Sequence, residues 1–218
     1  MANKYAPRKH LLVLMKEGQP EDDLIARLLD DDAGRDPLED SSDQAAFQRD
    51  AQWWTPLHWA AQDGHERLTK KLIEMHASTN SADQCGATPL MVASYNGHLG
   101  IVEKLIGERA TDVRQQNTYL STAVHYAAQR GHGDVIDALV LGKAQADSID
   151  RNGDTPLSWA GRYGHLDAVK KLLELRADPL SDNNATEDCI ELAKAAGFDE
   201  VVEMMEDAVE DKDLLANS

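Results

Sequence analysis

The sequence is poor in cysteine and has no long apolar run. Its 218 residues include two cysteines, Cys85 and Cys189, which give neither a disulfide framework nor a zinc-ligand spacing. No apolar stretch approaches the roughly 18–20 residues that span a membrane, and the one at residues 11–15 is too short for a secretory signal. These absences favour a soluble protein of a reducing compartment. We expect a cytoplasmic location, with the nucleus left open.

Motifs of catalysis are also missing. The sequence has no G-x-S-x-G, no H-E-x-x-H, no glycine loop that cradles phosphate and no C-x-x-C. We therefore predict a protein that is not an enzyme, with no catalytic residue, metal site, cofactor or small-molecule substrate. An enzymatic alternative would need a ligand pocket between residues 10 and 52, which lie outside the regular pattern described below.

The net charge of −17 is concentrated at the two ends of the chain. Residues 17–50 and 182–218 each hold 12 acidic residues, against 3 and 2 basic residues, whereas residues 51–181 are nearly neutral. Charge placed in this way keeps the ends of an extended molecule well solvated. An acidic docking surface for basic partners is the alternative.

One phrase occurs several times along the chain. "TPLHWAAQDGH" starts at Thr55, similar phrases start at Thr88, Thr122 and Thr155, and a looser copy starts at Asp188, so the spacings are 33, 34, 33 and 33 residues. Thr is suited to cap a helix, Pro to its first position and Gly to its end. A second amphipathic segment and a polar, turn-rich stretch follow in each copy. A fixed period of this length predicts a stacked array of helix pairs.

The motif T-P-L-H-x-A at this period resembles the ankyrin repeat family, and the resemblance covers residues 51–205. It implies an all-α repeat solenoid, an ankyrin-like stack of helix-turn-helix units joined by β-hairpin loops. The predicted divisions are a basic tail (1–9), a diverged N-terminal capping repeat (10–36), an acidic insertion loop (37–50), four repeats (51–84, 85–118, 119–151 and 152–184), a C-terminal capping repeat (185–209) and an acidic tail (210–218).

Six of the eight histidines lie inside the repeated phrase, which favours a structural role over metal binding. In ankyrin-like proteins such histidines hydrogen-bond backbone groups and threonine hydroxyls near the helix start. Equivalent positions of neighbouring units are about 10 Å apart, too far to share one metal ion. The six are His58, His65, His98, His125, His132 and His165.

The resemblance also implies where a partner binds, because ankyrin-like arrays usually use the concave side formed by hairpin tips and first helices. Eight of the eleven aromatic residues fall at these positions, whereas the predicted buried faces are aliphatic. Trp, Tyr and Arg often anchor protein interfaces. The predicted partner-binding residues are Trp53, Trp54, Trp59, Asp63, Tyr95, Asn96, Tyr119, Tyr126, Arg130, Arg151, Trp159, Arg162 and Tyr163.

Two alternatives stay open for particular residues. Trp59, Tyr126 and Trp159 could instead pack between adjacent first helices. His76, Arg109, Lys143 and Arg176 stand where the family usually has glycine after the second helix. A left-handed non-glycine residue costs about 1–2 kcal/mol, which the attraction of a cation to the helix C-terminus offsets in part. The alternative is that this cationic row grips an acidic or phosphorylated strand.

The function that follows is a non-enzymatic protein-protein interaction module that binds another protein or a peptide. We expect a monomer, and neither nucleic acid nor a membrane as partner. The alternative is a dedicated inhibitor or assembly chaperone of one enzyme or complex. Replacing Tyr126 and Trp159 by alanine is expected to abolish partner capture without unfolding the array.

Overall fold

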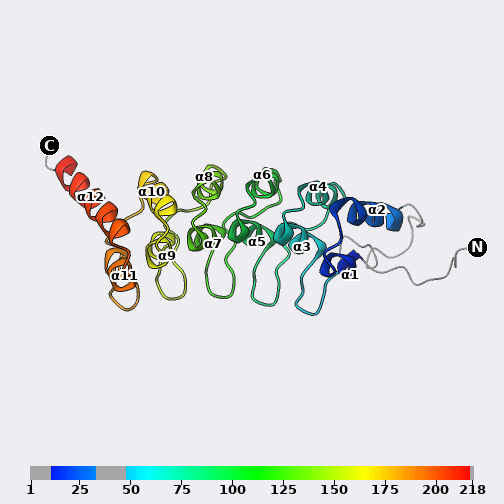
Figure 1. Cartoon of the computed structure of the whole chain (residues 1–218), viewed down its shortest axis with the longest axis horizontal. Helices are drawn as coiled ribbons and strands as arrows, with labels where there is room; N and C mark the ends of the chain where they lie inside the picture. The colour runs from blue at the N-terminus through cyan, green and yellow to red at the C-terminus, as the bar shows by residue number, and fades with distance from the viewer. Residues whose placement is uncertain (1–10, 33–47, 217–218) are drawn as a thin grey trace, which may run out of the picture.

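The repeats form one elongated row of helix pairs. The computed structural model describes residues 11–32 and 48–216, and these residues form twelve α-helices and no β-strand. The odd-numbered helices make one layer and the even-numbered helices make the other, with the loops extending from the odd-numbered layer (Figure 1). The prediction of an all-α repeat solenoid is confirmed.

Each of the five recognisable repeats contributes a first helix and a second helix. The first helices are α3 (Pro56–Asp63), α5 (Pro89–Asn96), α7 (Ala123–Arg130), α9 (Pro156–Tyr163) and α11 (Cys189–Ala196). The second helices are α4 (Glu66–Glu74), α6 (Leu99–Gly107), α8 (Gly133–Leu141), α10 (Leu166–Glu174) and α12 (Asp199–Ala216).

The predicted signals start and end the first helices. The Thr88 hydroxyl accepts a hydrogen bond from the Met91 amide at 3.3 Å, and the looser copy does the same with Asp188 and the Glu191 amide at 2.8 Å. Every first helix ends at a glycine with φ between 72° and 80°, such as Gly97. Glycine adopts this left-handed conformation without the steric cost of a Cβ, so the chain turns sharply into the second helix.

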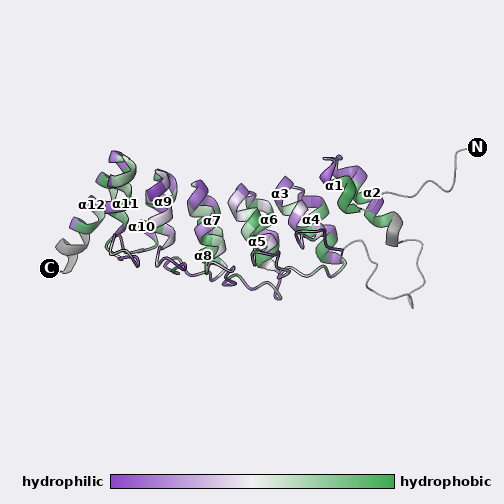
Figure 2. Cartoon of the chain, turned by 90° about the horizontal axis from the view of Figure 1, so that it is seen from below, coloured by the Kyte–Doolittle hydropathy of each residue, from purple (hydrophilic) through white to green (hydrophobic). Residues whose placement is uncertain are grey.

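The core lies between the two layers and between neighbouring first helices. It is aliphatic, with Leu57, Leu90 and Leu157 almost fully buried, and small residues such as Ala60 and Ala93 let the first helices approach closely. Each first helix packs on the next one along the row. Each helix therefore has hydrophobic residues that face this core and hydrophilic residues elsewhere, and both kinds are visible along the helices in Figure 2.

A short helix pair precedes the Thr55 repeat. Helix α1 (Leu11–Lys16) packs on α3, and α2 (Glu21–Asp32) packs on α4, as a further repeat would. The predicted basic tail at 1–9 and residues 37–47 of the predicted insertion lie outside the described residues. At the other end, α12 continues to Ala216, past the predicted limit of the capping repeat at residue 209.

The connecting loops are hairpin-shaped, and neighbouring loops are joined by one backbone hydrogen bond near their tips. The Thr118 amide donates to the Cys85 carbonyl at 2.9 Å, and the Arg151 amide donates to the Tyr119 carbonyl at 2.8 Å. No strand forms along these loops in the described residues. The loops consequently make a continuous edge to the stack.

Three of the four residues that stand in place of the glycine after the second helix adopt the left-handed backbone conformation. His76, Lys143 and Arg176 have φ of 62°, 74° and 65°, but Arg109 does not have positive φ. Helix α6 instead ends at Gly107 with Glu108 extended, and the Thr111 amide donates to the Glu108 carbonyl. The loop that follows carries the extra residue of the 34-residue spacing, which accounts for the different turn.

The predicted structural role of the buried histidines is confirmed. His58 and His125 are fully buried, and in each the Nδ1 atom accepts a hydrogen bond from the amide of the capping threonine at 3.2 Å. The Nε2 atom of His125 bonds the Asp154 carbonyl at 3.1 Å, and that of His58 bonds the Ala87 carbonyl at 3.1 Å. These rings therefore connect each helix start to the next loop.

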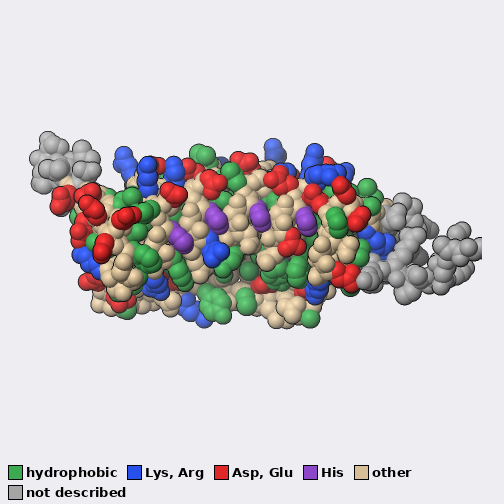
Figure 3. Space-filling model, viewed as in Figure 1, with side chains coloured by type: hydrophobic (Ala, Val, Ile, Leu, Met, Phe, Trp, Pro, Cys, Tyr) green, Lys and Arg blue, Asp and Glu red, His purple; other side chains and the backbone are tan. Residues whose placement is uncertain are grey.

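The histidines that follow the glycines also join successive repeats. The Nε2 atom of His98 bonds the Gln62 carbonyl and that of His165 bonds the Gln129 carbonyl, both in the preceding repeat. A row of histidine side chains crosses the face shown in Figure 3. In the part of the chain that the structure describes, no three His, Cys, Asp or Glu residues are placed to hold a metal ion.

The two cysteines lie in different environments. Cys189 is buried and its sulfur lies 3.3 Å from the Ser158 hydroxyl, whereas Cys85 is exposed on a loop. Burial raises the pKa of the Cys189 thiol. Among the described helices, none is both long enough and apolar enough to traverse a membrane.

Candidate protein interface

The first helices and the loops that precede them form one face, called here the inner face. Four residues occupy the same position on it, four residues after each capping threonine, namely Trp59, Val92, Tyr126 and Trp159. The three rings are half-buried and pack against the core, whereas Val92 is 8% exposed. Tyr126 and Trp159 meet edge to face with centroids 6.1 Å apart. They therefore belong to both the core and the surface.

The polar atoms of these rings are held by loop residues nine positions earlier. The indole N–H groups of Trp59 and Trp159 donate to the carboxylates of Asp50 and Asp150, both at 3.3 Å. At the equivalent place Asn117 donates its amide N–H to the Tyr126 hydroxyl oxygen at 2.7 Å. The carboxylates of Asp50 and Asp150 thus accept from indole N–H groups, whereas the side-chain amide of Asn117 donates to a hydroxyl oxygen. The ring and its loop residue are thus chemically matched.

The same loop residues also shape the hairpins, a role that the sequence analysis missed. One oxygen of Asp150 accepts the amides of Asn152 and Asp154, at 2.7 and 3.0 Å. The signal was available as an Asp or Asn that recurs with the period of the repeats. The equivalent residues are Asp50, Asp83, Asn117, Asp150 and Asn183.

Four of the predicted aromatic residues are well exposed on the loops and helix ends. The exposed fractions are 54% for Trp53, 36% for Tyr95, 55% for Tyr119 and 47% for Tyr163. Tyr163 stacks on the ring of His165 and its hydroxyl accepts a hydrogen bond from Gln129. These rings present apolar area that intramolecular packing leaves uncovered.

The three predicted arginines are each held in place by the fold. The Arg130 guanidinium lies 5.1 Å from the centroid of the Tyr95 ring, and that of Arg151 lies 5.9 Å from the Tyr119 ring. Arg162 forms an ion pair of 2.9 Å with the buried Asp154. Such contacts fix the positions of the three charges within the protein.

The remaining predicted residues lie nearer the N-terminal half of the face. Trp54 packs edge to face on Trp59 at 5.0 Å and donates its indole N–H to Asp83. Asn96 donates to the Val92 carbonyl at 2.9 Å, and Asp63 is exposed at the end of α3. Five of the predicted aromatic residues thus form two groups, one of Trp54 with Trp59 and one of Tyr126 with Tyr95 and Trp159.

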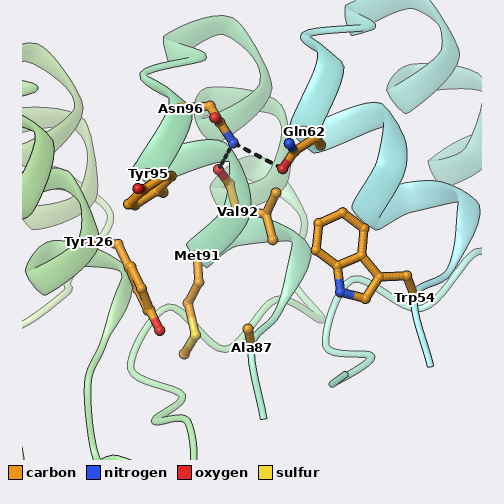
Figure 4. A pocket seen from close by; sticks show the side chains of 8 residues that line it. All are labelled: Trp54, Gln62, Ala87, Met91, Val92, Tyr95, Asn96 and Tyr126. Carbon is orange, nitrogen blue, oxygen red and sulfur yellow. Dashed lines mark hydrogen bonds between the residues drawn. The ribbon is translucent and has the colours of Figure 1, made fainter. Parts of the chain in front are cut away.

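A hollow of about 190 Å³ separates these two aromatic groups. Trp54 and Tyr126 stand on its two sides, Met91 and Val92 lie between them, and Gln62 and Asn96 are at its rim (Figure 4). Met91, Gln62 and Ala87 were not among the predicted site residues. Sequence reasoning missed them because nothing in the repeat pattern indicates which side chains surround a gap.

Charges near the N-terminal end of the face are mutually compensated. Lys16 lies 3.0 Å from the Asp50 carboxylate and 5.6 Å from the centroid of the Trp59 ring. Burial acts to raise the pKa of Asp50, but the hydrogen bonds from Lys16 and from two backbone amides outweigh it and lower the pKa. At the Tyr126 phenol, burial raises the pKa. Both groups therefore keep their ordinary charge states near neutral pH.

The packing changes the expected outcome of the double alanine substitution. Tyr126 and Trp159 contact each other, the core and the loop residues Asn117 and Asp150. Truncating large packed side chains costs several kcal/mol in cores, so the pair of substitutions would weaken the stack itself. Exposed residues give a cleaner test of binding.

Comparison with known proteins identifies the repeats. The family model described as "Ankyrin repeats (3 copies)" matches residues 12–117 and 110–183. The Neurogenic locus notch homolog protein 1 of Xenopus tropicalis is 29% identical over 80% of this chain, and the human protein of that name is 31% identical over 67% of it. The E3 ubiquitin-protein ligase XBAT33 of Arabidopsis thaliana is 30% identical over 63% of the chain.

These relatives are much longer proteins. The chain spans 7% and 6% of the two notch proteins and 28% of XBAT33. Ankyrin repeats are generally protein-protein interaction modules and typically do not catalyse reactions. The repeat spacing, the stacked helix pairs and the matching family model together place this chain in the ankyrin repeat family.

Proposed function

We propose that the chain binds a partner protein or peptide on its inner face, through the exposed rings of Trp53, Tyr95, Tyr119 and Tyr163 and the arginines beside them. The observation that carries the proposal is the placement of uncovered aromatic area next to fixed guanidinium groups. Aromatic residues and arginine contribute most to the energy of protein interfaces.

The arrangement is suited to binding because it is preorganised. Arg130 lies on Tyr95, Arg151 lies on Tyr119 and also donates to the Thr118 carbonyl, and each ring is carried by a packed repeat. Immobilising a flexible side chain on binding costs about 0.5–1.5 kcal/mol. Side chains that are already held avoid much of this cost.

The test uses exposed residues so that the stack stays intact. We compare the wild-type chain with the variant Tyr119→Ser, Arg130→Glu, Tyr163→Ser as bait in a native lysate, and quantify the captured proteins by mass spectrometry. The matched control is Leu141→Ser, because Leu141 is 85% exposed on α8, in the other layer. We expect capture to fall at least tenfold in the triple variant and to be unchanged in the control.

Circular dichroism and thermal unfolding must show that both variants keep the helical fold. A folded triple variant that captures the same proteins in the same amounts would rule out the inner face as the binding surface.

A further inference from the structure

The hollow on the inner face results from a break in the series of rings. At the equivalent position α3 has Trp59, α7 has Tyr126 and α9 has Trp159, whereas α5 has Val92. Valine lacks the volume of a tyrosine or tryptophan side chain. The space of about 190 Å³ opens in this repeat, between Trp54 and Tyr126 (Figure 4).

Several polar groups around the hollow already have partners within the protein. The Trp54 indole N–H donates to Asp83 at 3.1 Å, the Tyr126 hydroxyl accepts from Asn117, and the Asn96 amide donates to the Val92 carbonyl. The hollow therefore presents mainly ring faces and methyl groups. Such a lining favours an apolar side chain, whereas a polar side chain would lose its hydrogen bonds to water on entering it.

The size of the hollow fits one large side chain. A cavity of about 150 Å³ lined by apolar residues can hold a benzene molecule. A space of about 190 Å³ therefore accommodates one leucine, methionine or phenylalanine side chain. Burying such a side chain improves Kd by roughly tenfold to a hundredfold.

The charges beside the hollow indicate what should flank that side chain. The Arg130 guanidinium lies over the ring of Tyr95, which lines the hollow. The Arg151 guanidinium lies over the ring of Tyr119, in the loop that precedes α7. Among the described residues, neither guanidinium has a carboxylate within 4.0 Å, whereas Arg162 has Asp154. Positive charge without an internal counter-ion is complementary to an acidic group on a partner.

We propose that the hollow at Val92 receives one leucine, methionine or phenylalanine side chain of a partner peptide segment, and that an acidic side chain of the same segment pairs with Arg130. The proposal rests on the proposed function and specifies the partner by its chemistry. The partner side chain takes the place of the ring that α5 lacks.

The test is a selection of displayed random 12-residue peptides on the full chain, followed by Kd measurements with the enriched peptides. Val92→Trp fills the hollow with the residue found at the equivalent positions 59 and 159, so it should fold. Val92→Tyr copies the equivalent residue Tyr126 and replaces Val92→Trp in the Kd measurements if Val92→Trp does not fold. Arg130→Gln removes the charge, and Arg67→Gln on α4 is its matched control.

We expect the enriched peptides to share a leucine, methionine or phenylalanine together with an aspartate or glutamate. Their Kd should rise at least tenfold in the Val92 variant and about threefold to tenfold in Arg130→Gln, and should change less than twofold in Arg67→Gln. Sedimentation of the unbound chain should show no self-association through this face.

Several results would overturn the proposal. They are enrichment of no peptide, enrichment of peptides without an apolar residue, equal binding by the filled Val92 variant, or a homodimer that the Val92 variant abolishes. Peptides that are insensitive to Val92→Trp but lost in the Tyr119→Ser, Arg130→Glu, Tyr163→Ser variant would refute this inference and leave the proposed function standing. Peptides insensitive to both variants would contradict both.

Discussion

Asp150 allows a direct test of the match between a loop residue and its ring. Its carboxylate accepts two loop amides, from Asn152 and Asp154, and the indole N–H of Trp159. The residue is 6% exposed. Asparagine performs the same loop role at position 117, where the ring partner is a hydroxyl oxygen. Replacing Asp150 by alanine and by asparagine therefore separates the backbone bonds from the ring bond.

The magnitudes follow from which bonds each substitution removes. Alanine removes all three bonds, and a hydrogen bond to a charged group contributes about 1.5–3 kcal/mol when buried. Because the loop lies near the surface and water can replace part of the loss, we expect Asp150→Ala to cost about 2–4 kcal/mol. Asparagine keeps the two bonds to the loop amides but places its own NH2 group against the indole N–H of Trp159, so that only the bond to the ring is lost. We therefore expect Asp150→Asn to lower the free energy of unfolding by about 1 kcal/mol.

The assay is urea unfolding of the full chain followed by circular dichroism, with the change read from the midpoint when the slope is constant. The matched control is Asp147→Ala, an exposed acid at the start of the same loop, which should change stability by less than about 0.5 kcal/mol. Equal costs for alanine and asparagine, or a cost below about 1 kcal/mol for alanine, would refute the role assigned to the loop residues.

Two further predictions concern the helix ends. Burial lowers the pKa values of His58 and His125 below the ordinary value of 6.5. The contribution of the two neutral rings to the free energy of unfolding is therefore present above pH 6.5 and is lost as the pH falls below it. Two protons can contribute at most about 2.7 kcal/mol per pH unit to the slope of unfolding free energy against pH. The variant His58→Ser, His125→Ser, which copies the equivalent residue Ser158, should have a smaller slope than the wild type between pH 7 and 5 in urea unfolding. If the variant kept the slope of the wild type, His58 and His125 would not be the source of the pH dependence. The second prediction is that Lys143→Gly and Arg176→Gly each raise the free energy of unfolding by about 1 kcal/mol, because both residues have positive φ. Arg109→Gly should not raise it, because Arg109 does not have positive φ. Equal effects of the three substitutions in urea unfolding would contradict the strain argument.

Much of the fold could be predicted from local pattern because each repeat specifies its own helices. A capping threonine or aspartate and a terminal glycine define each first helix, and the alanines beside Leu57 mark the side that packs. The turn after α6 could not be predicted in the same way. Arg109 occupies the position of Lys143 in the repeat, but one extra loop residue changes the conformation there.

The candidate interface was less predictable than the fold. Periodicity locates the aromatic positions on one face, but it does not distinguish a ring packed into the core from an exposed one. Trp159 and Tyr119 illustrate the difference, since the first is half-buried against its neighbours and the second is 55% exposed. The distinction depends on what lies in the adjacent repeat and loop, which are separated from the residue by about one period.

The sequence by itself determined the number, type and order of the helix pairs, because capping, helix termination and amphipathic spacing act over a few neighbouring residues. Stacking decided the rest. It brought Asp150 to Trp159, placed Arg130 over Tyr95 and opened the hollow at Val92, since each of these depends on how side chains from separate segments fill or leave the space between them.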